Sequence, residues 1–94
     1  MTIFTLTNIN TQSEEFEQYR ELDIQVQVSP SSIFDGAVLR CEVQQDSIGY
    51  TPLTESDFSM IGSDIFLLTM RIGSKYRFYI ENATATTNII VSVL

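Results

Sequence analysis

The side chains that could perform chemistry in this 94-residue sequence are few. There is no histidine, the commonest general base and a frequent metal ligand, and Cys41 is the single cysteine. Cys41 shares one face of an expected strand with Leu39 and Val43, and buried free cysteines usually behave as small hydrophobic side chains. One cysteine without histidine also cannot assemble an ordinary zinc site. We therefore expect a non-enzymatic protein without a bound cofactor or metal.

Acidic residues cluster in one stretch, and paired carboxylates can catalyse proton transfer or glycoside hydrolysis. The stretch contains Glu14, Glu15, Glu17, Glu21 and Asp23. It has the character of a solvated segment and not of a cleft, so a charged surface is the favoured interpretation.

A second acidic group, Glu55, Asp57 and Asp64, flanks a loop that could hold calcium. These three carboxylates supply fewer oxygen ligands than calcium usually takes, and the spacing of an EF-hand is absent. We expect no metal site in this loop.

Basic side chains gather near the C-terminal third of the chain. Arg71, Lys75 and Arg77 surround a Gly-Ser turn and are interleaved with aromatic residues such as Tyr79. Such a mixture can bind nucleic acid, but the net charge of −7 opposes contact with a polyanion or an anionic membrane. Residues 1–64 carry a net −9 and residues 65–94 a net +2. An ordinary solvated surface is the favoured interpretation of this separation, and a polar molecule suited to head-to-tail contacts with copies or with an acidic partner is the alternative. We expect the basic segment to contact a protein.

Hydrophobic periodicity predicts the elements that position these groups. Residues 22–28 read Leu-Asp-Ile-Gln-Val-Gln-Val, apolar at every second position, which is the pattern of a half-buried strand. Residues 64–72 are apolar on both faces, which predicts a strand covered on both sides. Pro52 is tolerated only in an edge strand. The expected strands span residues 2–7, 22–28, 37–44, 50–55, 64–72, 75–81 and 86–94.

The segment before the 22–28 strand is read differently. Thr11 and Glu14 fit a helical capping box, and Phe16 and Tyr19 would share a helical face. These features predict a short helical turn near residues 12–21. Phe16 is also in register with residues 22–28 at period two, so one long bent strand is the alternative.

Six or seven short strands with turns about ten residues apart are typical of an all-β sandwich or small barrel. The run Tyr-Arg-Phe-Tyr-Ile-Glu-Asn-Ala at 76–83, a Thr-rich turn and the apolar run 89–93 resemble the last hairpin of fibronectin-III or immunoglobulin-like domains. Tyr76 stands where those families place a corner tyrosine, although their tryptophan and cysteine pair are absent. The resemblance implies a single immunoglobulin-like antiparallel β-sandwich of about seven strands spanning residues 1–94.

The function expected from these observations is structural. The strands at 65–72 and 89–94 carry more apolar surface than two layers hide, so another chain is expected to cover one outer face. Small modules of this kind resemble accessory proteins of virus particles, especially bacteriophage capsid decoration, cement or tail proteins. This resemblance implies a virion protein that binds a repeating protein lattice, in a larger assembly or homo-oligomer, without direct nucleic-acid or membrane contact. The candidate contact residues are Arg71, Lys75, Arg77, Tyr79, Glu14, Glu15, Glu17 and Glu21.

An alternative function uses the acidic run as a mimic of phosphates. In that case the chain is a small phage-encoded regulator or inhibitor, and residues 14–23 bind a basic groove of a host nucleic-acid enzyme. The first ten residues do not have the pattern of a signal peptide, and no apolar run reaches the length of a membrane span. We therefore expect localisation in the virion after assembly in the host cytoplasm, and otherwise in the cytoplasm.

Overall fold

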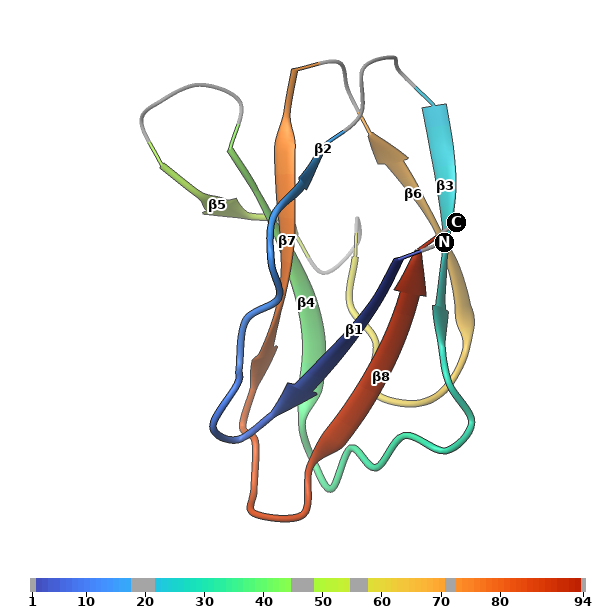
Figure 1. Ribbon diagram of the computed structural model, residues 1–94, viewed down its shortest axis with the longest axis vertical. Coiled ribbons are helices and arrows are strands. Elements are labelled where there is room, and N and C mark those ends of the chain that lie inside the picture. The colour runs from blue at the N-terminus through green and yellow to red at the C-terminus, as the bar shows by residue number, and fades with distance from the viewer. Residues whose placement is uncertain (1, 18–21, 45–48, 55–57, 71–72, 94) are drawn as a thin grey trace.

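The computed structural model describes residues 2–17, 22–44, 49–54, 58–70 and 73–93. These residues form two antiparallel four-stranded sheets that face each other (Figure 1). Sheet I has the order β1-β8-β3-β6, and sheet II has the order β2-β7-β4-β5. The strands are β1 (Thr2–Thr7), β2 (Phe16–Glu17), β3 (Leu22–Val28), β4 (Val38–Gln44), β5 (Thr51–Pro52), β6 (Ile65–Met70), β7 (Lys75–Glu81) and β8 (Asn88–Val93). The expected all-β, antiparallel class is confirmed, and the arrangement is consistent with a sandwich.

The alternation read from the sequence sets the inner face of each sheet. In β3, Ile24, Val26 and Val28 are buried while Asp23 and Gln27 are exposed, as period-two patterning requires. In β4, β7 and β8 the buried side chains likewise fall at every second position. The predicted strands at 22–28, 37–44 and 75–81 are therefore confirmed within one residue at either end.

Aromatic side chains join the two sheets at the centre of the core. Phe78 of sheet II is fully buried, and its ring centroid lies 5.9 Å from that of Phe4 in sheet I. Phe16 and Phe58 pack on the same ring at 5.2 Å and 5.6 Å. Because one ring contacts β1, β2 and the β5–β6 connection, the two sheets share a single core.

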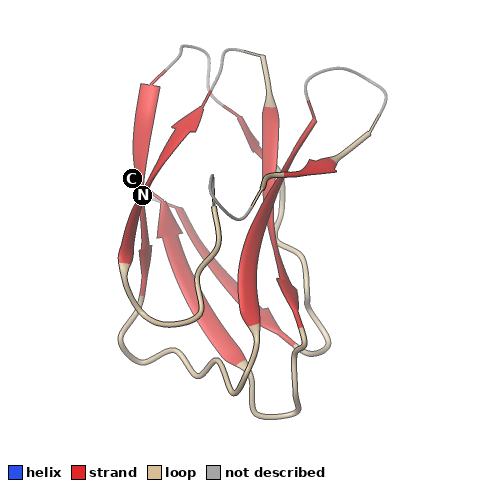
Figure 2. Ribbon diagram, turned by 180° about the vertical axis from the view of Figure 1, so that it is seen from behind, coloured by secondary structure: helices blue, strands red, loops and turns tan. Residues whose placement is uncertain are grey.

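The predicted helical turn near residues 12–21 is wrong for the part that the structure describes. From behind (Figure 2), the described residues contain strands and loops but no helix. The backbone of residues 11–17 runs beside β7, where the Ser13 amide donates to the Phe78 carbonyl and Phe16 pairs with Tyr76. Pairing with β7 and burial of the Phe16 ring outweigh the local capping preference, because helix propensity is weak against tertiary packing. Residues 18–21 lie outside the described part.

The expected C-terminal hairpin is also not observed. β7 pairs with β2 and β4 in sheet II, whereas β8 pairs with β1 and β3 in sheet I. The Thr-rich turn therefore forms an arch between the sheets. Immunoglobulin domains keep their last two strands in one sheet, so their topology is not confirmed by these pairings. Tyr76 is buried, and the relation to these families stays a prediction.

β6 differs from its prediction as a strand covered on both sides. It lies at the edge of sheet I and pairs with β3 alone among the described strands. Its inner residue Leu68 is buried, but Ile65 and Leu67 are 54% and 66% exposed. The apolar outward side chains of β6 are thus left uncovered by the described part of the chain.

Candidate functional site

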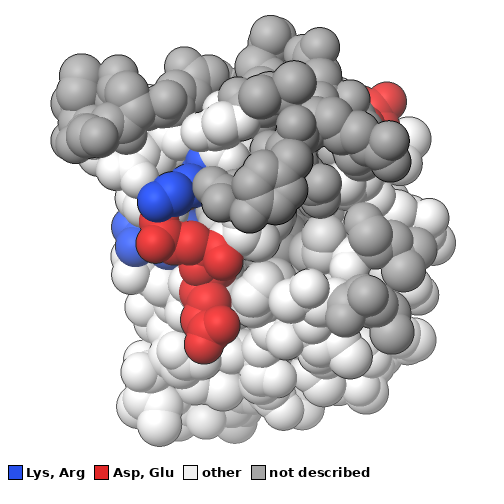
Figure 3. All heavy atoms as spheres, turned by 45° about the horizontal axis from the view of Figure 1, so that its top comes forward, with Lys and Arg blue, Asp and Glu red and all other residues white. Residues whose placement is uncertain are grey.

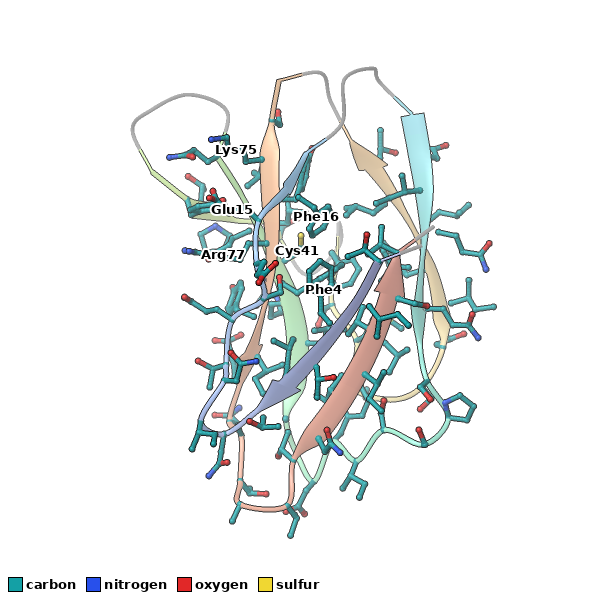
Figure 4. The ribbon with its side chains drawn as sticks, in the orientation of Figure 1. Phe4, Glu15, Phe16, Cys41, Lys75 and Arg77 are labelled. Atoms are coloured by element: carbon teal, nitrogen blue, oxygen red, sulfur yellow. The ribbon has the colours of Figure 1, made fainter. Side chains whose placement is uncertain are left out.

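The outer face of sheet II carries a compact group of polar side chains. The Arg77 Nε donates to a Glu42 carboxylate oxygen on the neighbouring strand β4. The Arg77 guanidinium carbon lies 3.9 Å from the centre of the Tyr50 ring, within the range of a cation–π contact. The Tyr50 hydroxyl in turn donates to the Glu15 carboxylate. Figure 4 shows Glu15 and Arg77 on the same side of sheet II. We call Glu15, Glu42, Tyr50 and Arg77 the charged cluster.

Strand pairing explains why acidic and basic segments meet here. β2 pairs with β7 so that Glu17 is opposite Lys75 and Phe16 is opposite Tyr76. Phe16 is held by packing of its ring on Tyr76 at 6.0 Å and on Phe78. The acidic run therefore lies across the basic strand, and acidic and basic side chains adjoin in Figure 3. The charge separation along the sequence is not a separation in space for these residues.

A second ion pair extends the polar face of sheet II. Arg40 Nη1 lies 3.2 Å from Glu81 Oε1, and its other terminal nitrogen donates to the Leu53 carbonyl. The Arg40 side chain is only 13% exposed. Arg40 and Arg77 thus each interact with a carboxylate of the same sheet.

Both described outer tyrosines of this sheet resist ionisation. Burial, together with donation to Glu15, raises the pKa of Tyr50 to about 12. Burial also raises the pKa of Tyr79, which pairs across the sheet with Arg40. Both phenols are therefore neutral at physiological pH and act as hydrogen-bonding and packing groups.

The eight sequence-predicted contact residues are only partly brought together. Glu14, Glu15 and Lys75 are exposed on the β2–β7 side, while Arg77 and Tyr79 are half-buried in sheet II. The backbone of Glu17 lies in β2. Arg71 and Glu21 lie outside the described residues. Sequence reasoning missed Glu42 and Arg40 as partners, because only the cross-strand register brings them to Arg77 and Tyr79. It also missed Tyr50, which reaches Arg77 and Glu15 from the segment before β5.

The outer face of sheet I has the opposite character. Asp23 is the one charged residue in its four strands, and it accepts a hydrogen bond from Thr69 at 2.6 Å. The middle of the face carries uncharged polar side chains of β3 and β8, namely Gln25, Gln27 and Ser92.

Apolar side chains lie at both margins of sheet I. Ile3 of β1 is 59% exposed at one margin, and Ile65 and Leu67 of β6 lie at the other. Ile61 and Ile65 also line a surface hollow of about 300 Å³ formed by residues 59–66. We call Ile61, Ile65 and Leu67 the β6 margin. The apolar run at residues 64–72 already indicated Ile65 and Leu67 in the sequence. Ile61 lies outside that run, in the loop that precedes β6.

The remaining reactive groups are placed as follows. Cys41 is fully buried on the inner face of β4, and desolvation raises the pKa of its thiol to about 12. Within the described ranges, no three Asp, Glu or Cys side chains are grouped so that they could bind a metal ion. Glu55 and Asp57, two of the three carboxylates that flank the loop considered for calcium, lie outside the described residues.

Comparison with known protein families, with curated protein sequences and with solved structures found no match. The described residues also include no helix with the length and apolar character required to cross a membrane. The function is therefore inferred from the surfaces of the two sheets.

Proposed function

We propose that this chain is a non-enzymatic structural protein that binds a larger protein assembly, and that the assembly is a virus particle on which it serves as an accessory or decoration protein. The observation that carries the proposal is the β6 margin, where Ile61, Ile65 and Leu67 are 77%, 54% and 66% exposed. A monomeric protein exposes single apolar side chains routinely, but a group of them beside a sheet face with a single charged side chain is typical of a protein contact.

The charges favour sheet I over sheet II as the contact surface. The arginines of sheet II are engaged by Glu42, Glu81 and the Tyr50 ring, so a partner would have to break these interactions to use them. The strands of sheet I offer uncharged side chains with the exception of Asp23. Covering this face strips water from few charged groups, and the desolvation cost of binding is correspondingly low.

The expected contribution of the β6 margin is moderate. Complete burial of an Ile or Leu side chain contributes about 1.5–3 kcal/mol, and these side chains are already partly covered. A single contact of this kind is weak. A repeating lattice that binds many copies compensates, because each bound copy then experiences a high local concentration of neighbouring sites and copies.

Native fractionation tests the proposal. Source material is separated by size without denaturant, and the chain is located by mass spectrometry. The proposal expects the chain at a fixed ratio to another protein in a megadalton particle. Recovery as a small species or as a one-to-one complex with an enzyme would contradict it.

Paired variants locate the contact on the assembly. Leu67→Lys places a charge in the β6 margin and is expected to lower occupancy on the particle at least tenfold. Lys75→Glu reverses the charge of an exposed side chain on sheet II. It is expected to leave occupancy within about twofold of the wild type, since the proposed contact lies on sheet I. A larger loss with Lys75→Glu would move the contact to the charged cluster.

A further inference from the structure

Among the described strands, the backbone of β6 pairs on one side only. The Val28 amide donates to the Asp64 carbonyl at 2.9 Å, and the register continues with Val26 opposite Phe66 and Ile24 opposite Leu68. Hydrogen-bonded pairs alternate along an antiparallel ladder, so the even-numbered residues of β6 bond to β3. The amides and carbonyls of Ile65, Leu67 and Thr69 therefore point away from β3. The same three residues place their side chains on the outer face.

The other sheet edges are covered or short in the described structure. At β1, the Asn10 side-chain amide donates to the Thr5 carbonyl at 2.8 Å, so the following loop occupies part of that edge. In sheet II the edge strands β2 and β5 have two residues each, and β5 contains Pro52.

β6 is six residues long and has neither proline nor a charged side chain. Proteins usually protect a long edge with such residues, and an unprotected apolar edge is a template for another strand.

We propose that β6 pairs in antiparallel orientation with β6 of a second copy, about a twofold axis at Leu67. Leu67 would then exchange hydrogen bonds with Leu67 of the second copy, and Ile65 would be opposite Thr69 of that copy. This register uses all three outward-pointing residues of the strand. The Ile65 amide is already bonded to the Asp64 side chain at 2.7 Å, so in each copy the new ladder uses the amides of Leu67 and Thr69 and the carbonyls of Ile65 and Leu67. Sheet I would become one continuous sheet across the dimer.

The symmetric register matches the three outward-pointing residues of one copy with those of a second copy, and charge selects this strip for the contact. Two chains of net charge −7 repel each other, and they approach most easily through a strip without charged side chains. In the antiparallel pair the two Asp64 carboxylates lie at opposite ends of the joined strands, so these like charges stay apart. The apolar Ile65 and Leu67 side chains of both copies would form one ridge on the outer face. The inference rests on the proposed function in taking sheet I as the contact surface, and it names the partner of the β6 edge.

The expected dimer is weak. One strand pair with its flanking side chains falls at the small end of protein interfaces, below about 1,200 Å² in total. We expect a dissociation constant of about 10–100 µM for the isolated chain.

Sedimentation equilibrium of the purified chain tests the inference. The wild type is expected to move from 10.7 kDa towards twice that mass as its concentration rises to about 0.5 mM. Leu67→Pro removes an outward amide, which an edge strand tolerates, and Leu67→Lys sets two like charges on the axis. Both variants are expected to remain monomeric. Gln25→Lys is the matched control, because Gln25 is opposite Leu67 on the same face but one strand inward. It is expected to dimerise within about threefold of the wild type.

Two results would overturn the inference. One is a wild type that remains a monomer to about 1 mM, and the other is a Leu67→Lys variant that dimerises as well as Gln25→Lys. If Leu67→Pro unfolds by circular dichroism, Leu67→Lys alone decides. Recovery of a monomeric wild type in a particle would overturn the self-pairing and retain the proposed function. Conversely, the wild type could dimerise, lose the dimer with Leu67→Lys, and never be recovered in a particle. That result would support the self-pairing and contradict the proposed function.

Discussion

The two outer faces of this small protein are built from strands of different length and from different side chains. Sheet II neutralises its own charges, since Arg77 is held by Glu42 and Tyr50 and Arg40 is held by Glu81. Sheet I has almost no charge to neutralise and leaves Ile65 and Leu67 at its edge. The difference teaches that the more charged face of a domain need not be the face that binds. Charges already paired internally are costly to recruit, whereas an uncovered apolar edge gains from any suitable strand.

The largest expected effect is on the core that both faces share. Phe78→Ala removes a fully buried ring that contacts Phe4, Phe16 and Phe58. Loss of such a ring costs about 3–5 kcal/mol, which is a large part of the stability of a small domain. Urea unfolding followed by tyrosine fluorescence and by circular dichroism is expected to show both sheets destabilised together. Survival of sheet I signals while sheet II unfolds would show that the faces belong to separate cores.

Alkaline pH is expected to act next most strongly, and through sheet II. The Cys41 thiol has an ordinary pKa of 9.0 that burial raises to about 12. The unfolded chain therefore releases this proton first, and the free energy of unfolding decreases between pH 9 and 12, at up to about 1.4 kcal/mol per pH unit. Tyr50, whose pKa is raised from 10.0 to about 12, adds to the loss above pH 10.

Cysteine and tyrosine variants separate these two contributions. Cys41→Ala is expected to be less stable at pH 7 but to have a flatter pH dependence between 9 and 10. Tyr50→Phe is expected to flatten the dependence above pH 10 only. Urea midpoints at half-unit pH intervals measure both. A Cys41→Ala profile parallel to that of the wild type would place the alkaline sensitivity elsewhere.

Arg77 and Leu67 offer a direct comparison of the two faces. Arg77→Ala leaves the mostly buried Glu42 carboxylate without its cation and is expected to cost about 1–3 kcal/mol. Leu67→Ala shortens a 66% exposed side chain and is expected to change stability by less than about 0.5 kcal/mol. Guanidinium unfolding of the two variants at low protein concentration measures the difference. Equal losses would contradict the view that sheet II uses its charges internally.

The smallest effect is expected at the loops that join the sheets. The Asp35 carboxylate accepts hydrogen bonds from the Thr84 and Thr86 hydroxyls, which lower its pKa below 3.8. Stability from this group is present above the ordinary pKa and is lost as pH falls through the lowered value.

Asp35→Asn suits the turn because the backbone there has φ 48°, a conformation that asparagine tolerates. This variant is expected to lose less thermal stability than the wild type between pH 5 and pH 2.5. An unchanged acid profile would show that the two threonines do not stabilise the carboxylate form.

The sequence predicted the fold class and the inner faces because both depend on local alternation. Ile24, Val26 and Phe78 are buried wherever their strands pair, so period two was sufficient to identify them. The segment around Phe16 could not be predicted in the same way. Its conformation depends on β7, 60 residues later, and a capping box carries no information about that pairing.

The candidate sites were predictable to a lesser extent. The apolar outward residues of β6 were visible as a run without alternation, but their position at a sheet edge depends on strand order. The charged cluster requires the registers of β2, β4 and β7 together, so Glu15, Glu42 and Arg77 could not be recognised as neighbours from their spacing. Likewise, the separation of charge along the sequence did not indicate that acidic and basic segments would lie in one sheet.

The central claim is that copies and partners meet sheet I at β6 and not sheet II at the charged cluster. Amide chemical shifts measured by nitrogen-15 NMR over a range of protein concentrations test it most directly. The account predicts concentration-dependent shifts at the outward-pointing amides of Leu67 and Thr69, with those of Arg77 and Tyr79 unchanged. Shifts confined to Lys75, Arg77 and Tyr79, with β6 unaffected, would contradict it.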